Sequence, residues 1–432
     1  MSRVLFVVLS LFSASAIAAT HRLDLKKTVE YAVENAPELE VVRREMTIAD
    51  MQRKNAYSVF LPQLDLAANY GLNDRDPQLS PALSRYSSDF GLYLTENLYD
   101  NGISFINYDS AKVTKKLADL NYNKERDRIV LNIVSEFLNV SLVMRLYDVQ
   151  KTQFDIIQKQ FNSISNQYKQ GVKTRRDYLR FKSELRRSEI QLQNSKTLVH
   201  NRKADLIKLL TSTSDILASD FDFLPEDVDT KIVKNVPTEK PNVEDHWIFR
   251  MVRMREEIFD NTILVSRRSY YPQVFLSGGV SYGSANYWKS GTSFKDNDFT
   301  SWNALLTVNF NLWDWGIRNR NISISQDRKV QQMKSLEVEM NEFIASNEKL
   351  MANMVLSHNN FLTAQELLEI ETSAYSFLEG EYRNGRVSYL DLILGLRDLL
   401  NAKIQMFTSF YDLRTQLFQY KYHQGKLYEE FQ

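Results

Sequence analysis

The chain has 432 residues, no cysteine, and 54 basic against 54 acidic side chains. The absence of cysteine excludes disulfides, thiolate metal sites and a lipid anchor on an N-terminal cysteine. The balanced charge gives no electrostatic reason to expect nucleic acid as a partner.

The first nineteen residues have the organisation of a secretory signal peptide. Arg3 precedes an apolar core from Val4 to Phe12, and small residues follow as far as Ala19. This pattern predicts a signal peptide over residues 1–19 that is cleaved on export. We find no later run that approaches the ~18 apolar residues of a transmembrane helix. An exported chain of this kind could therefore cross a membrane only with β-strands.

The remaining sequence is duplicated. The stretch LPQLDLAANYG (61–71) matches YPQVFLSGGVSYG (271–283), and LTENLYDNG (94–102) matches VNFNLWDWG (308–316). Such self-similarity predicts two copies of one structural unit. Repeat 1 is expected at 20–211, with an initial helix, strands at 61–71 and 89–100, a long helix at 102–168, a turn at Gly171 and a helix at 174–211. Repeat 2 is expected at 243–432, with an initial helix, strands at 272–283 and 300–312, a long helix at 316–382, a turn at Gly385, a helix at 388–420 and a C-terminal tail.

The predicted strands alternate between apolar and polar residues. In 301–312, Trp302, Leu306 and Phe310 fall on one face, while Asn303, Asn309 and other polar residues fall on the opposite face. Period-two alternation over about ten residues fits tilted transmembrane strands, but also a soluble sandwich of packed sheets. Because membrane strands tolerate no open edge and the smallest such barrels have about eight strands, a membrane-spanning arrangement would need several chains to share one barrel.

The predicted long helices contain no proline and repeat apolar residues every seven positions. In the second copy Met333, Met340, Met354 and Phe361 follow this spacing, with Asn347 as a polar interruption. Sustained heptads predict coiled-coil packing. A 67-residue helix would be roughly 100 Å long at 1.5 Å per residue. Polar seam positions suit the wall of a hollow tube, and an ordinary helical bundle is the alternative.

Together these landmarks resemble the TolC family of outer-membrane efflux and secretion channels. The resemblance rests on the Pro-Gln openings of the first strands, the corners LYDNG and LWDWG, and the paired glycine turns, the second followed by SYLDLI. Family corners follow the pattern P-L-F-D-G-G, whereas Asn97 and Asn311 replace the proline here. The resemblance implies an α+β membrane protein and a trimeric α/β-barrel. Each chain would give four transmembrane strands to a shared twelve-stranded barrel that continues into a long α-helical coiled-coil periplasmic tube.

The same resemblance implies a function and partners. The homotrimer would act as a passive exit duct in the outer membrane, in contact with its lipid. It would work with a periplasmic adaptor protein and an inner-membrane transporter of the RND, ABC or MFS type, in efflux or type I secretion. Segment 212–242, with Pro225, Pro237 and Pro241, would belong to a belt around the tube. The alternative function is a trimeric coiled-coil scaffold in the periplasm or on the surface that transports nothing.

Asp391 is the main candidate for a gate residue, with Asp177 as its counterpart in the first repeat. The resemblance implies an acidic ring that narrows the periplasmic entrance and favours cations. A second acid of the family pattern is replaced here by Leu394. The alternative role is helix capping, because Ser388-x-x-Asp391 and Thr174-x-x-Asp177 both fit a capping box.

The turns also supply candidate adaptor-docking residues. Gly171 and Gly385 are expected in the left-handed conformation that ends a helix. The basic residues around them could complement an acidic adaptor surface, or could simply be solvated helix ends: Lys173, Arg175, Arg176, Arg383 and Arg386. Further candidates are the helix caps Thr174, Ser388, Asp100 and Asp314, and the membrane-interface aromatics Tyr70, Tyr282, Trp288 and Trp302, whose alternative role is sheet packing.

The sequence shows no catalytic pattern. The five histidines are scattered, and neither a metal-ligand spacing nor a nucleophile elbow nor a phosphate-binding glycine loop occurs. We therefore expect no enzyme activity, no cofactor and no metal site.

Overall fold

The computed structural model describes residues 21–72, 84–210, 221–229, 236–237, 246–289 and 292–432. The expected signal peptide and most of segment 212–242 lie outside these residues. The chain divides into two compact units: unit 1 comprises 1–40, 125–243 and 345–432, and unit 2 comprises 41–124 and 244–344. Two helices of 67 residues each, α3 (Ile103–Lys169) and α7 (Ile317–Arg383), begin in unit 2 and end in unit 1.

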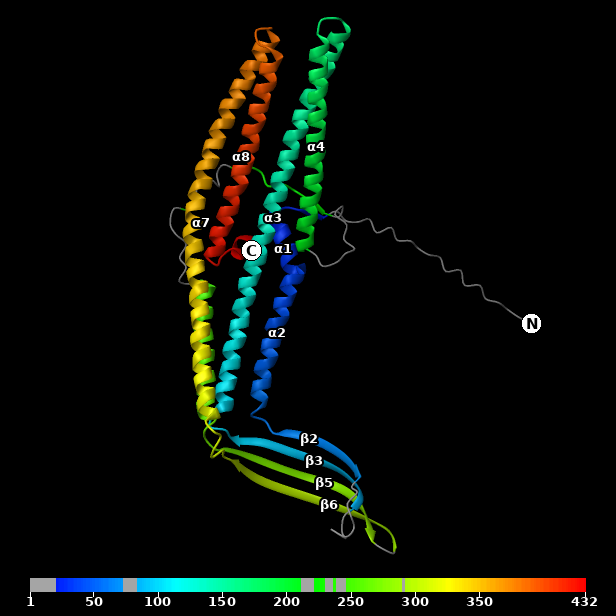
Figure 1. The fold of residues 1–432 in the computed structure, drawn as a ribbon, viewed down its shortest axis with the longest axis vertical. Helices are drawn as coiled ribbons and strands as arrows, with labels where there is room; N and C mark the ends of the chain where they lie inside the picture. Colours follow the sequence, from blue (N-terminus) through cyan, green and yellow to red (C-terminus); the bar gives the residue numbers. More distant parts are fainter. Residues whose placement is uncertain (1–20, 73–83, 211–220, 230–235, 238–245, 290–291) are drawn as a thin grey trace, which may run out of the picture. The chain divides into compact units, whose positions relative to one another are not determined.

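Unit 2 contains a four-stranded antiparallel sheet in the order β2-β3-β5-β6 (Figure 1). Its strands are β2 (Gln63–Leu72), β3 (Ser84–Tyr99), β5 (Gln273–Lys289) and β6 (Thr292–Asn309). One cross-strand row consists of Leu66, Leu92, Val280 and Trp302. The apolar positions of the four alternating segments therefore line up on one face of the sheet. Both repeats contribute a hairpin, and the two hairpins join through β3 and β5.

All four strands extend beyond their expected bounds, β2 by a single residue to Leu72. β3 begins at Ser84 rather than at 89, β5 continues to Lys289 rather than 283, and β6 begins at Thr292 rather than 300. The backbone ladder between β5 and β6 continues through polar residues to the pair Lys289 and Thr292. Main-chain pairing needs no apolar side chain, so the apolar alternation marks only part of each hairpin. β6 also ends at Asn309, three residues before the expected end.

The sheet strands are preceded by helices. α2 (Pro37–Ser58) leads into β2, and α6 (Trp247–Arg268) leads into β5. In unit 2, His246 is the buried N-cap of α6, and its ring stacks on Phe343 of α7 with 4.2 Å between ring centroids. This contact holds the start of α6 against α7.

Unit 1 is built from two helical hairpins, each closed by a short turn (Figure 1). α3 is followed by α4 (Arg175–Leu210), and α7 is followed by α8 (Tyr389–His423). The heptad positions Met354 and Phe361 on α7 and Leu413 on α8 are at most 1 % exposed. Val149 of α3 packs with Leu396 of α8 in the core. The seven-residue spacing thus forms the packed seams between these helices.

Unit 1 also contains a short two-stranded sheet. β1 (His21–Leu23) pairs in parallel with β4 (Phe221–Phe223), and α1 (Leu25–Asn35) follows β1. Just after β4, Glu226 accepts a hydrogen bond from Arg414 of α8 at 2.5 Å, and Tyr411 donates to its carbonyl at 2.6 Å. The 3₁₀ helix η2 (Tyr428–Phe431) ends the chain, and Phe431 stacks on Phe418.

The expectation that no segment is apolar enough for a transmembrane helix is wrong by length and composition. Among the described residues one helix, α3, contains an 18-residue window that passes this test. Half of the window is buried, and buried apolar residues of α3 from Ile129 to Leu138 belong to the core of unit 1. The window is therefore explained by helix packing.

Candidate functional site

The two helical turns of unit 1 have the same backbone structure. Gly171 and Gly385 have φ values of 77° and 72°. Val172 N donates to Gln167 O at 2.9 Å and Gly171 N to Tyr168 O at 3.0 Å, which is the pair of bonds that defines a Schellman motif. The second turn repeats both bonds at the equivalent positions. Glycine occupies the left-handed position because it has no Cβ to clash there.

Each turn is followed by a capped helix. Ser388 is the N-cap of α8: Asp391 N donates to Ser388 Oγ at 3.3 Å, and Ser388 N donates to Asp391 Oδ2 at 3.1 Å. These reciprocal bonds form a capping box. At α4, Asp177 N donates to Thr174 Oγ1 at 3.2 Å, and Thr174 Oγ1 donates to Asp177 Oδ2 at 2.8 Å. Asp391 is exposed, and its capping bonds converge on one carboxylate oxygen.

An open cavity of about 540 Å³ lies beside the turns in unit 1. Its aromatic wall is formed by Phe181 of α4, Tyr382 of α7 and Tyr389 of α8, and the Phe181 and Tyr389 ring centroids are 3.8 Å apart. Its polar lining includes Lys173, Asp177, Arg180 and Glu184 from the first repeat and Ser388 from the second. Both hairpins therefore contribute to one amphipathic cavity beside the caps.

Tyr389 links the two hairpins directly. Its hydroxyl donates to Gln160 Oε1 of α3 at 2.6 Å. Burial raises the pKa of this phenol, with smaller contributions from Tyr382, Glu184 and Tyr375. The hydroxyl therefore stays protonated and can act as the donor.

The basic residues of the two turns differ in their local partners. Arg383 pairs with Glu379 at 2.6 Å, and Arg386 pairs with Glu381 at 3.1 Å. Within the described parts of the chain, Arg175 and Arg176 make no ion pair.

The charges of the first turn also act on its carboxylate. The hydrogen bond from Thr174 lowers the pKa of Asp177 despite an opposing effect of burial, and the charges of Arg176 and Lys173 add to the lowering. The first turn thus keeps an exposed positive charge, whereas glutamates offset the arginines of the second.

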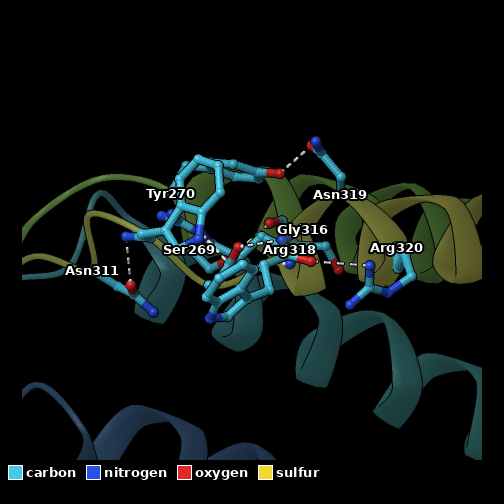
Figure 2. A network of polar contacts seen from close by, with 11 residues as sticks. Ser269, Tyr270, Asn311, Gly316, Arg318, Asn319 and Arg320 are labelled. Carbon is cyan, nitrogen blue, oxygen red and sulfur yellow. Dashed lines mark hydrogen bonds and ion pairs between the residues drawn. The ribbon is translucent and has the colours of Figure 1, made fainter.

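Unit 2 contains the two strand-to-helix corners, where Asp100 and Asp314 occupy equivalent positions. Ser104 N donates to Asp100 Oδ2 at 2.7 Å, and Arg318 N donates to Asp314 Oδ2 at 3.0 Å. Figure 2 shows the second corner, where Gly316 N also donates to Asp314 Oδ1 at 3.0 Å. Both aspartates accept backbone hydrogen bonds in the first turn of the following helix.

The electrostatics of Asp314 follow from these contacts. Burial opposes its ionisation, but hydrogen bonds from Arg318 and Gly316 outweigh that effect and lower the pKa of Asp314. The Arg318 guanidinium is 2.7 Å from the carboxylate and also lies 4.5 Å from the centre of the Tyr270 ring. Tyr270 in turn donates to Asn319 (Figure 2).

Three of the four expected interface aromatics are described on the sheet. Tyr70, Tyr282 and Trp302 are 73 %, 54 % and 78 % exposed in the single chain. Trp288 lies in β5, but its side chain falls outside the described residues. Among the residues the structure describes, no group of three or more His, Asp or Glu side chains is placed to hold a metal ion.

The structure adds residues that the sequence pattern does not single out. Gln160, Arg180 and Phe181 meet Tyr389 or line the cavity, although each lies within an ordinary helical pattern. Only Tyr389 carried a signal, since it is an aromatic residue directly after a predicted N-cap. At the second corner, Trp313 and Trp315 are 73 % and 79 % exposed.

Comparison with known protein families gives a match over most of the chain. The outer membrane efflux protein family matches residues 28–212 and 249–419. The chain therefore belongs to this family of outer-membrane efflux channels, whose members are not enzymes. Comparison with curated proteins finds no match.

Solved structures support the fold. The chain is similar to the CmeC outer membrane channel of Campylobacter jejuni, with a TM-score of 0.78, 16 % identity, and coverage of 93 % of this chain and 86 % of that one. It is also similar to the open state of the MtrE outer membrane channel of Neisseria gonorrhoeae, with a TM-score of 0.71, 16 % identity, and coverage of 93 % and 89 %. For the VceC outer membrane protein of Vibrio cholerae the TM-score is 0.66, the identity 17 %, and the coverage 93 % and 96 %.

Proposed function

We propose that three copies of this chain form the outer-membrane exit duct of a tripartite efflux pump or a type I secretion system. The observation that carries this proposal is the four-stranded sheet of unit 2. Within the part of the chain that the structure describes, its outer strands, β2 and β6, each pair with one strand. Its apolar side chains are exposed, including Leu66 at 63 %, Val280 at 57 % and Trp302 at 78 %.

An isolated sheet of this kind is unfavourable in both water and lipid. In water it exposes a large apolar face, and in lipid its unpaired strand edges would cost several kcal/mol per unsatisfied group. Pairing β2 of one copy with β6 of the next removes both edges. Three such junctions close a twelve-stranded barrel, in which the row containing Leu66 and Trp302 faces lipid.

The two turns of unit 1 would form the periplasmic end of the duct. The positive charge at Lys173 and at the exposed Arg175 and Arg176 supports docking of an adaptor protein with an acidic tip. Three copies of Asp391 around a three-fold axis would form an acidic ring that favours cations, while each carboxylate also caps its helix. An inner-membrane transporter of the RND, ABC or MFS type would supply the energy, since this chain has no nucleotide-binding or catalytic pattern.

The export route belongs to the same proposal. Residues 1–19 would direct secretion and be removed, and the protein would reach the outer membrane without an N-terminal lipid. The competing function is a scaffold that transports nothing. It predicts a protein that is soluble without detergent, whereas the duct requires detergent for extraction.

The decisive experiment is conductance across a planar lipid bilayer. We expect the purified protein to give single channels that favour cations, and Asp391→Asn to reduce this preference. Ser388→Ala removes the cap but keeps the carboxylate, so it should leave the preference largely intact. Absence of channels from a correctly folded trimer would refute the duct. Equal loss of selectivity in both variants would assign Asp391 to capping alone.

A further inference from the structure

The second strand-to-helix corner contains a backbone conformation that does not suit its residue. Trp315 has a φ of 56°, in the left-handed region, and Gly316 follows with a φ of 77°. At the equivalent positions of the first repeat, Asn101 has a φ of 60° and Gly102 a φ of 72°. Asparagine tolerates this region, whereas a bulky aromatic residue there is a true outlier. The fold requires a left-handed residue at each corner, but only the second corner uses tryptophan.

The first corner shows what asparagine contributes. Asn101 Nδ2 donates to Pro272 O at 2.8 Å, and Asn101 O accepts from Arg268 Nη1 at 2.7 Å. Its side chain therefore ties the two repeats together at the base of the sheet. The Trp315 side chain instead projects into solvent and is 79 % exposed. Because the Trp315 side chain makes no comparable buried contact with the residues that the structure describes, fold stability does not explain why tryptophan occupies a strained position.

Trp315 lies within a run of exposed apolar residues. Leu312 and Trp313 are 79 % and 73 % exposed, and the Trp313 and Trp315 rings meet edge to face with centroids 5.9 Å apart. The run begins with Phe310, just beyond the end of β6, and continues to Ile317 in the first turn of α7. It therefore continues the exposed apolar side chains of β6 past the end of the strand.

An exposed cationic group lies at each corner. Arg320 Nη1 donates to Trp315 O at 3.1 Å (Figure 2), and Arg268 Nη1 donates to Asn101 O. Both side chains belong to exposed residues, and both bonds end on carbonyls, so these contacts leave the guanidinium charges uncompensated. Asp314, the acid of the second corner, is already paired with Arg318 at 2.7 Å.

We propose that Trp313, Trp315 and Arg320 form a binding surface for the headgroup region of glycerophospholipids at the end of the sheet. An indole has an apolar body and an N–H donor, and it is enriched where hydrocarbon meets headgroups. Guanidinium groups bind phosphates through paired donors. The inference rests on the proposed function, because it requires the sheet to lie in a membrane. The exposed positive charge favours lipid phosphate over a second copy of this chain as the occupant.

The test uses tryptophan fluorescence in reconstituted trimers. The chain has five tryptophans, so a variant that keeps only Trp315 carries phenylalanine at 247, 288, 302 and 313. A matched variant keeps only Trp302, on the apolar face of the sheet. Both are placed in phosphatidylethanolamine and phosphatidylglycerol vesicles that contain lipids brominated either near the headgroup or deep in the acyl chain.

We expect Trp315 to lose most of its emission to shallow bromine and little to deep bromine. Arg320→Gln should weaken this quenching in phosphatidylglycerol vesicles. If Trp315 is quenched by neither label while Trp302 is quenched, the corner does not contact lipid and the lipid surface is refuted, although the duct survives. If Trp302 also escapes quenching, the membrane-embedded sheet itself is refuted.

Discussion

The hydroxyl oxygen of Tyr389 lies 2.6 Å from Gln160 Oε1, so a single hydrogen bond joins the start of α8 to α3 beside the cavity between the turns. Tyr389→Phe keeps the ring against Phe181 and removes only this donor. We expect it to destabilise the contact between the hairpins by about 1 kcal/mol. Amide hydrogen exchange should become faster in the first turns of α8.

The matched control for this prediction is Tyr382→Phe. Tyr382 lines the same cavity and meets the Tyr389 ring at 5.9 Å between centroids, but no interhelical hydrogen bond from its hydroxyl occurs within the described residues. Its loss of a hydroxyl should leave exchange in α8 nearly unchanged. Equal protection in wild type and Tyr389→Phe would show that ring packing alone holds the hairpins together.

Two glycines five residues apart should respond oppositely to alanine. A Cβ at Gly380 or at Gly385 would meet no atom within 4 Å, so space does not decide the outcome at either position. Gly385 has a φ of 72°, where alanine is penalised by about 1 kcal/mol. Gly380 lies within α7, where alanine is favoured over glycine by about 1 kcal/mol.

Thermal unfolding in detergent would measure this pair of changes. Gly385→Ala should lower the midpoint and Gly380→Ala should raise it. A lowered midpoint for both variants would mean that the helix around Gly380 is already covered in the assembled protein. Gly171→Ala should behave like Gly385→Ala, since its φ is 77° and its surroundings are also open.

The periodic parts of the structure were accessible from the sequence, but the contacts between them were not. The alternation of apolar and polar residues around Leu66 and Trp302 predicts strands, because one face of such a strand contacts lipid or a protein core. The heptads through Met354 and Phe361 predict packed helices. Neither pattern identifies which distant residue a given residue contacts in the folded chain. The bond from Tyr389 to Gln160 joins positions 229 residues apart, so it follows from the packing of two hairpins and from no local motif.

The corners illustrate a different limit. Asp100 and Asp314 are recognisable as cap candidates because an aspartate before a helix has a specific local role. The left-handed Trp315 could not be expected, since tryptophan has no preference for that conformation. The sequence likewise did not predict the polar ends of β5 and β6, because their pairing depends on the backbone and on the register set by the neighbouring strand.

Acidification should lower the stability of unit 1 because His423 titrates. Burial lowers the pKa of His423 in the folded protein below its ordinary value of 6.5. At a pH between the two pKa values, His423 is protonated in the unfolded chain but neutral in the folded chain. The free energy of unfolding therefore falls as the pH drops from about 6.5 through the folded-state pKa. Above the unfolded-state value both states are neutral and the contribution to stability is fully present.

Unfolding midpoints between about pH 7.5 and about pH 5 would measure this effect. His423→Gln should flatten the profile, because glutamine does not titrate. His200→Gln provides the control, since His200 is exposed on α4. A profile that is as steep in His423→Gln as in wild type would assign the acid sensitivity to other groups.

Trp315→Asn should separate stability from membrane contact at the second corner. The substitution installs the residue that the first repeat uses at a nearly identical φ, and left-handed strain at a non-glycine residue costs of order 1 kcal/mol. We therefore expect a more stable protein in detergent. Trp315→Phe keeps a bulky ring in the left-handed conformation and should not gain this stability.

If Trp315 serves as a lipid contact, the asparagine variant should nevertheless insert less readily into phospholipid vesicles than wild type. A variant that is less stable than wild type in detergent would show that the indole makes a stabilising contact in the assembled protein, and the strain argument would then be wrong.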